Sequence, residues 1–122
     1  MHLLLAVLAS LQMALWIGLS AFGAHALKDT LTPASLALWD TASLYLGIGS
    51  LVVLSLSLLL PTLTRPLWLL EVGVLLFSLS LYALALGAPS IVGAITPLGG
   101  LSMMFSFLWL AYALYGINTQ LV

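Results

Sequence analysis

The chain has 122 residues, of which 64% are hydrophobic and 4% are charged, and its formal net charge is -1. A soluble domain carries about 25% charged residues, so this composition excludes an ordinary water-soluble globule and indicates an integral membrane protein. Two basic residues cannot form a nucleic-acid-binding surface. The lack of cysteine excludes disulfides, thiolate catalysis and cysteine-ligated metals.

The first apolar segment, residues 3–22, has two readings. Ala24, His25 and Ala26 fit the small-x-small cleavage pattern of a signal peptide. However, no Lys or Arg precedes the apolar run, whereas a signal peptide begins with positive charge. We therefore expect a retained membrane helix over residues 3–22.

Three further segments follow. Crossing about 30 Å of hydrocarbon takes about 20 apolar residues in a helix. The segments that satisfy this length are 33–60, with its membrane part at 42–60, then 66–86 and 97–115. We predict an all-α integral membrane four-helix bundle, formed by a single transmembrane domain over residues 1–122.

The connection between the first two helices is longer than the others. Thr32 followed by Pro33 is typical of a helix start, with a hydroxyl N-cap and proline at the first helical position. A helix from Pro33 to Leu60 exceeds the hydrocarbon thickness, so its first turns should lie among the lipid headgroups. Trp39 as an anchor and Asp40 in water suit that depth. We expect an interfacial loop or helix here, in which Lys28 and Asp29 face water.

Small and polar residues at helical spacing are expected to mark the faces that pack, because lipid tails do not drive apolar helix surfaces together. The alternative is a substrate path along the same faces. The residues are Ala6, Ser10, Ala14 and Gly18 in the first helix, Ser43, Gly47, Ser50 and Ser57 in the second, Glu71, Ser78 and Tyr82 in the third, and Ser102, Ser106 and Ala113 in the fourth.

Glu71 is the most informative single residue. It lies five positions after Pro66, or about 7 Å along the helix, which predicts a place at the edge of the hydrocarbon. One interpretation is a carboxylate that reaches the interface or pairs with Arg65, and the other is an acid that couples to proton or cation movement. Asp40 could also be such an acid, but a position at the interface is favoured because the adjacent Trp39 already suggests that depth.

The chain contains few other groups that could do chemistry. His25 could be a general base, a ligand or a hydrogen-bonded residue at a helix end, and the last of these is favoured. His2, His25 and the scattered carboxylates show no metal-ligand spacing. No phosphate-binding loop or nucleophile motif appears. We expect no catalytic residue, no metal and no cofactor, and therefore no enzyme.

Four segments carry a family resemblance: SAFGAHALKDTL at 20–31, WDTASLY at 39–45, LFSLSLYALAL at 76–86 and ITPLGG at 95–100. They resemble the family known as domain of unknown function 423, which includes the animal transmembrane protein 256. The resemblance implies a four-helix membrane protein. In a bacterium, we expect it to reside in the inner (plasma) membrane. The resemblance implies no activity.

The matched motifs imply one shared site. The first and third connections emerge on the same membrane face, so we expect their motif residues to meet, with His25 bonded to residues 93–100. The site residues are Phe22, Gly23, His25, Lys28, Thr96, Pro97, Gly99 and Gly100. The chain departs from the family pattern at Leu46 and Gly49, where relatives often carry glutamine and histidine, and at Leu79, where they carry glycine.

The first functional hypothesis is a structural or accessory subunit of a larger membrane assembly. Its partners would be the lipid bilayer and other membrane subunits or a second copy, with no nucleic acid. The alternative is a small proton- or cation-coupled transporter, which could be a dimer. Arg65 shares a side with both termini, which by the positive-inside rule predicts cytoplasmic termini.

Overall fold

The structure, a computed structural model, describes residues 2–121 and consists of four long helices. These are α1 (His2–His25), α2 (Pro33–Leu59), α3 (Thr64–Ala85) and α4 (Ile95–Leu121), with short 3-10 helices η1 (Pro61–Leu63) and η2 (Ser90–Ala94) before α3 and α4. All four are long and apolar enough to cross a membrane. The prediction of an all-α four-helix membrane protein is confirmed.

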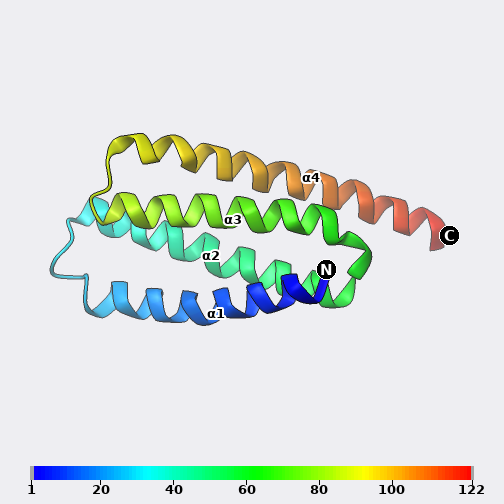
Figure 1. The fold of residues 1–122 in the computed structure, drawn as a ribbon, viewed down its shortest axis with the longest axis horizontal. Helices are drawn as coiled ribbons and strands as arrows, with labels where there is room; N and C mark the ends of the chain where they lie inside the picture. The colour runs from blue at the N-terminus through cyan, green and yellow to red at the C-terminus, as the bar shows by residue number, and fades with distance from the viewer. Residues whose placement is uncertain (1, 122) are drawn as a thin grey trace.

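The helices pack in chain order. α1 packs along α2, α2 along α3 and α3 along α4, and α1 also touches α3. Successive helices run antiparallel, so the two termini lie at the same end of the molecule and the α1–α2 and α3–α4 connections lie at the other (Figure 1). α4 therefore has α3 as its main neighbour, whereas α3 is covered on several sides.

The ends of the helices differ from the predicted ones. α1 continues through Gly23 to His25, and α4 runs on to Leu121, so the polar residues at 118–120 are helical. Residues 26–32 form turns and no helix of their own. Thr32 caps α2 as expected, because its Oγ1 accepts a hydrogen bond of 3.1 Å from the backbone N–H of Ser35, and Pro33 is the first helical residue.

The predicted packing faces are right for α2 and α3. Ser43, Gly47, Ser50 and Ser57 are buried in α2, as are Glu71, Ser78 and Tyr82 in α3. In α4, Ser106 is buried, and Ser102 and Ala113 are half-buried.

The predicted packing face of α1 is wrong. Ala6 is buried, but Ser10, Ala14 and Gly18 are exposed. The buried residues are Leu5, Ala6, Ala9, Gln12 and Gly23. This face brings Gln12 to α2 and α3, where its amide finds polar partners. Turning the small residues inward would leave that amide in lipid, which costs more than exposing serine, alanine and glycine.

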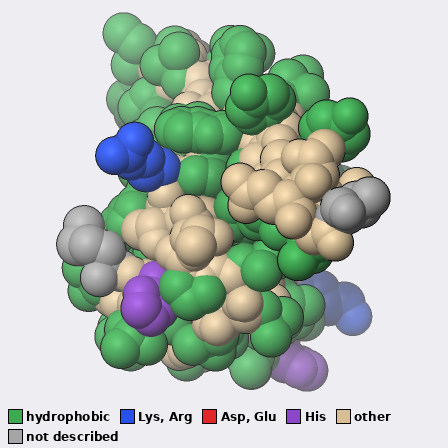
Figure 2. All heavy atoms as spheres, turned by 90° about the vertical axis from the view of Figure 1, so that its right-hand side faces the viewer, with side chains coloured by type: hydrophobic (Ala, Val, Ile, Leu, Met, Phe, Trp, Pro, Cys, Tyr) green, Lys and Arg blue, Asp and Glu red, His purple; other side chains and the backbone are tan. Residues whose placement is uncertain are grey.

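The outer surface is mostly aliphatic and aromatic. The face at the end that carries the termini shows mainly hydrophobic side chains, with few Lys, Arg or His groups (Figure 2). Lys28, Asp29, Asp40 and Arg65 are exposed and lie close to helix ends or in turns, whereas Glu71 is buried. An apolar surface with charges near its two ends suits a bilayer environment.

Candidate functional site

The expected shared site is divided between two helix pairs. Residues 22–25 are in the last turn of α1 and Lys28 is in the turn that follows, whereas residues 96–100 begin α4. Both segments lie at the same end of the molecule, but α1 packs along α2 and α4 along α3 (Figure 1). His25 is exposed, and no hydrogen bond joins it to residues 93–100 in the described part of the chain. Of the motif residues, Gly23 lies in one helix contact, and Thr96 and Gly99 lie in a second, separate contact.

The first contact is between Gly23 and Trp39. A Cβ atom on Gly23 would lie 2.4 Å from Nε1 of Trp39, so only glycine admits the indole. The Trp39 Nε1–H donates a 2.9 Å hydrogen bond to the backbone carbonyl of Leu19 on α1. Trp39 is 3% exposed, so its indole is part of the α1–α2 contact rather than an anchor that faces the headgroups.

Trp39 also joins α2 to α3. Its ring packs edge-on against Tyr82, with centroids 4.5 Å apart, and the Tyr82 hydroxyl lies 2.7 Å from Ser43 Oγ. Edge-to-face aromatic pairs contribute about 0.5–1.5 kcal/mol beyond the area they bury. The FGAH and WDTASLY segments therefore hold three helices together at one end of the molecule.

The second contact is a close approach of α3 and α4. A Cβ atom on Gly99 would lie 2.4 Å from the backbone N of Phe77, and one on Gly73 would lie 2.9 Å from the backbone N of Met103. Two backbones that meet so closely need glycine on both sides, as in other membrane helix pairs. The TPLGG segment is thus a helix-packing motif.

Hydrogen bonds flank this approach on both sides. Ser80 and Thr96 have their hydroxyl oxygens 2.6 Å apart, and Ser106 Oγ donates a 2.7 Å bond to the carbonyl of Pro66. Pro97 has no N–H to leave unbonded in the first turn of α4, which suits its position. The hydroxyl groups of Ser80, Thr96 and Ser106 thus have hydrogen-bond partners inside the protein, which they need because lipid offers none.

A polar centre lies between α1, α2 and α3. Nε2 of Gln12 donates a hydrogen bond to Oε1 of Glu71, and Ser50 Oγ donates a 2.8 Å bond to Oε1 of Gln12. Glu71 is 1% exposed, Gln12 7% and Ser50 0%. The second carboxyl oxygen of Glu71, Oε2, is buried without a hydrogen-bond partner. We call Gln12, Ser50 and Glu71 the polar centre.

The polar centre is deep in the bundle. At 1.5 Å per residue, each of its three residues lies within about 6 Å of the midpoint of its own helix. The interpretation that the Glu71 carboxylate reaches the interface or pairs with Arg65 does not fit these positions: Glu71 is buried, Arg65 is exposed, and no ion pair joins them. Asp40 is exposed near the start of α2, far along the helix from Ser50.

Sequence analysis did not single out Gln12, although a signal was present. It is the one amide in an apolar helix of 24 residues, and polar side chains inside membrane segments usually have a partner. Its partner Glu71 is 59 positions away, so no local pattern connects them.

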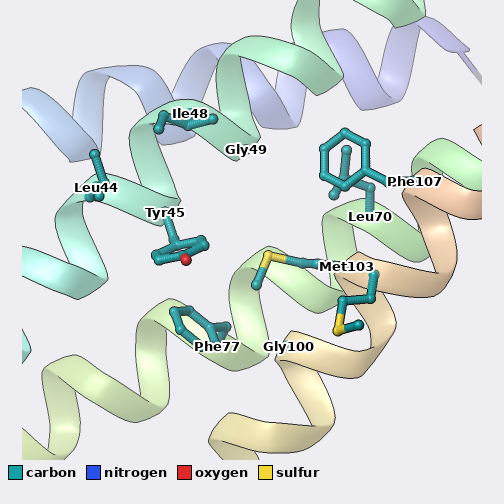
Figure 3. Close-up of a pocket in the computed structure, with 10 residues that line it drawn as sticks. Leu44, Tyr45, Ile48, Gly49, Leu70, Phe77, Gly100, Met103 and Phe107 are labelled. Carbon is teal, nitrogen blue, oxygen red and sulfur yellow. The ribbon is translucent and has the colours of Figure 1, made fainter.

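An apolar groove opens between α2 and α4, with α3 as its floor (Figure 3). Its volume is about 420 Å³. Tyr45 and Phe77 pack at one end with their rings tilted by 58° and their centroids 4.6 Å apart, and Met103 and Phe107 line the α4 side. We call this the α2–α4 groove; its lining residues are Leu44, Tyr45, Ile48, Gly49, Leu70, Phe77, Gly100, Met103, Met104 and Phe107.

The three departures from the family pattern fall in different places. Leu46 is completely buried, and Gly49 packs so closely on Val74 that a Cβ atom would lie 2.3 Å from its side chain. A histidine at position 49 would need α2 and α3 to separate. Leu79 is 49% exposed, so this change affects the outer surface and not the interior.

The described residues contain no group of three or more His, Asp or Glu side chains that could hold a metal. The features that they do contain are buried hydrogen bonds, one buried carboxyl group and an apolar groove.

Comparisons with known proteins agree that this is a membrane protein. A family model described as "Protein of unknown function (DUF423)" matches residues 19–100. UPF0382 membrane protein YwdK of Bacillus subtilis is 37% identical over 113 residues, covering 88% of this chain and 92% of the relative. A UPF0382 membrane protein of Staphylococcus epidermidis is 37% identical over 111 residues, covering 88% and 91%. One from Haemophilus influenzae is 36% identical over 102 residues, covering 79% and 81%.

No solved structure matches the chain. The matched region extends from the last turns of α1 to the start of α4, and so includes both glycine contacts and all of α2 and α3. The chain is therefore a member of the DUF423 family of UPF0382 membrane proteins, a family of unknown function.

Proposed function

We propose that this protein is a structural or accessory subunit that binds another membrane protein side by side within the bilayer. The observation that carries the proposal is the α2–α4 groove, which faces the surrounding lipid. Its occupant would be a membrane-spanning helix of the partner. The apolar lining and its aromatic and methionine side chains suit a helix-in-groove contact.

The shape of the molecule supports this role. The buried residues of α4 are Gly99, Met103, Ser106 and Leu110, and they all face α3. The other side of α4 exposes large apolar groups such as Met104, Phe105 and Leu108. The turns between helices are short, so little of the chain extends beyond the bilayer to contact a partner in water. Contact within the membrane is thus the main route open to it.

Cross-linking from single cysteines tests the proposal, because the chain has no cysteine of its own. A photoreactive probe would be attached at Met104→Cys in the groove, or at Leu11→Cys on the exposed side of α1, in cells that make the protein at native level. We expect one membrane protein, identified by mass spectrometry, to be captured from position 104 and not from position 11.

A groove-filling variant makes the test specific. A Cβ atom on Gly100 would lie 3.8 Å from Phe77, so Gly100→Leu can extend into the groove without forcing α3 and α4 apart. It should reduce capture of that protein from position 104 at least tenfold. Equal capture from both positions, or capture that Gly100→Leu leaves unchanged, would argue against a partner in the groove.

A small proton- or cation-coupled transporter is the second candidate, and the buried carboxyl group of Glu71 favours it. Purified protein in liposomes with an internal pH-sensitive dye would release or take up protons on addition of a substrate, and Glu71→Gln would abolish the signal. Against this candidate, Glu71 lines neither the α2–α4 groove nor the smaller apolar cavity beside α3 and η2.

We further propose that the protein resides in the inner (plasma) membrane of a bacterium with both termini in the cytoplasm. Arg65 and the two termini share one end of the molecule, and basic residues favour the cytoplasmic side. A C-terminal fusion to green fluorescent protein should fluoresce, whereas a C-terminal fusion to alkaline phosphatase should be inactive. The reverse pattern would place both termini outside.

A further inference from the structure

We infer that the polar centre is a binding site for one exchangeable monovalent cation, either a proton or an alkali ion, held at Oε2 of Glu71. This oxygen is buried and accepts no hydrogen bond, whereas Oε1 is bonded to Gln12. A carboxyl oxygen in such surroundings needs a positive partner, because a bare negative charge is costly in the membrane interior.

The protein supplies no such partner from the described residues. Along α3, Arg65 is exposed and forms no ion pair, and the hydroxyl of Tyr82 is bonded to Ser43. The neighbouring helices place their titratable groups away from Glu71, near helix ends or on the outer surface: His2 and His25 on α1, Asp40 and Tyr45 on α2, and Tyr112 and Tyr115 on α4. The positive charge must therefore come from the medium.

The oxygens at the site select the class of cation. One carboxyl group lies there, the amide oxygen of Gln12 is already occupied by the hydroxyl of Ser50, and the other acids of the described residues, Asp29 and Asp40, are exposed elsewhere. A divalent ion such as calcium needs six to eight oxygens and usually several carboxylates. A single carboxyl group balances a single positive charge, so one proton or one alkali ion fits the site.

Gln12 determines which oxygen is free. Its amide N–H holds Oε1 of Glu71, and its own oxygen is held by the hydroxyl of Ser50. This chain of two bonds fixes the carboxyl group against α1 and α2 and leaves Oε2 as the site for the cation. The inference concerns binding only, so it rests neither on a partner in the α2–α4 groove nor on transport.

Unfolding of the purified protein tests the inference, since a cation that binds only the folded state raises the unfolding temperature as its concentration rises. The probes are protons, in a pH series in choline chloride, and sodium or potassium, in a concentration series at fixed alkaline pH. If the proton is the cation, the midpoint should fall by several degrees as pH rises. If an alkali ion binds, adding the salt of that ion should raise the unfolding temperature.

Two variants complete the test. Glu71→Gln keeps a hydrogen-bonding side chain at the site without the charge, and it should remove the response to cations. Asp40→Asn changes an exposed acid on α2 and should respond as the wild type does. A wild type that responds to neither protons nor alkali ions, or a Glu71→Gln protein that responds as the wild type does, overturns the inference.

A second measurement covers the case in which Glu71→Gln does not fold. Glu71 is the only glutamate in the chain, so ¹³C-labelled glutamate gives an infrared carboxyl signal from this residue alone. We expect the signal of the wild type to change between its acid and carboxylate forms across the pH series, or to shift when sodium or potassium is added. A signal that stays constant in both series would refute an exchangeable cation.

Discussion

The unit formed by α1, α2 and α3 and the single helix α4 are held in the molecule by different means. Eleven residues of α3 are buried against four of α4, so α3 is the centre of the structure and α4 is attached at its side. Side-chain hydrogen bonds and an aromatic pair join the first three helices. α4 depends mainly on the close approach of Gly73 and Gly99, with a hydroxyl bond at each side.

This difference shows how a membrane protein divides its polar groups. The buried acid and amide are in the three-helix unit, where each has partners on other helices. α4 carries no charged residue and leaves a wide apolar side to the bilayer. The first region has a fixed internal arrangement, and the second presents an apolar surface to the bilayer.

The largest expected effect comes from separating α4 from α3. Gly99→Val places a side chain against the backbone of Phe77 and should destabilise the protein by about 3 kcal/mol, as overpacking does in other cores. The free energy of unfolding, measured by titration with a denaturing detergent, checks this. Gly18→Val is the matched control, because a Cβ atom there meets nothing within 4 Å. Similar losses for both variants would contradict the close approach.

Breaking the polar centre should have the next largest effect. Gln12→Leu removes the donor to Glu71 and leaves a buried carboxyl oxygen unbonded, which costs about 1–3 kcal/mol. The same unfolding titration measures it. Gln120→Leu, at an exposed position near the end of α4, should change stability by less than about 0.5 kcal/mol. If Gln12→Leu leaves the free energy of unfolding unchanged, Gln12 does not face Glu71.

A smaller effect is expected where α1 meets α2. Gly23→Ala puts a methyl group against the Trp39 indole, which must move and weaken its bond to Leu19. We expect a loss of about 1–2 kcal/mol together with a shift in tryptophan emission. Gly116→Ala, at an open position, should leave both the stability and the emission of the protein nearly unchanged.

The smallest effect tests the hydroxyl bond between α3 and α4. Ser80→Ala removes the partner of Thr96 and should cost about 0.6 kcal/mol, the average for such bonds between membrane helices. Ser102→Ala is its control, since that hydroxyl bonds only to Leu98 within its own helix. If Ser102→Ala costs as much as Ser80→Ala, the bond between helices adds nothing to stability.

The fold could be predicted from the sequence because it depends on local features. The lengths of the apolar segments predict the four helices, and Thr32 followed by Pro33 predicts the start of α2. Serines seven residues apart identify the inner side of α2, because Ser43, Ser50 and Ser57 recur on one face of a helix.

The candidate site could not be predicted in the same way. A ridge of small residues on α1 can face either lipid or another helix, so Ser10, Ala14 and Gly18 do not determine which face of α1 is buried. The hydrogen bond between Gln12 and Glu71 determines the buried face, and Glu71 is 59 positions further along the chain. For the same reason the depth of Glu71, counted from Pro66, pointed to the wrong surroundings.

A double-mutant cycle between Gln12 and Glu71 tests the account most directly. The free energies of unfolding would be measured for wild type, Gln12→Leu, Glu71→Leu and the double variant in one lipid environment. We predict that the double variant loses less stability than the sum of the single variants, by at least about 1 kcal/mol, because neither polar group is then left alone. Additive losses would show that the two side chains do not meet, and would contradict the polar centre on which the arrangement of α1, α2 and α3 depends.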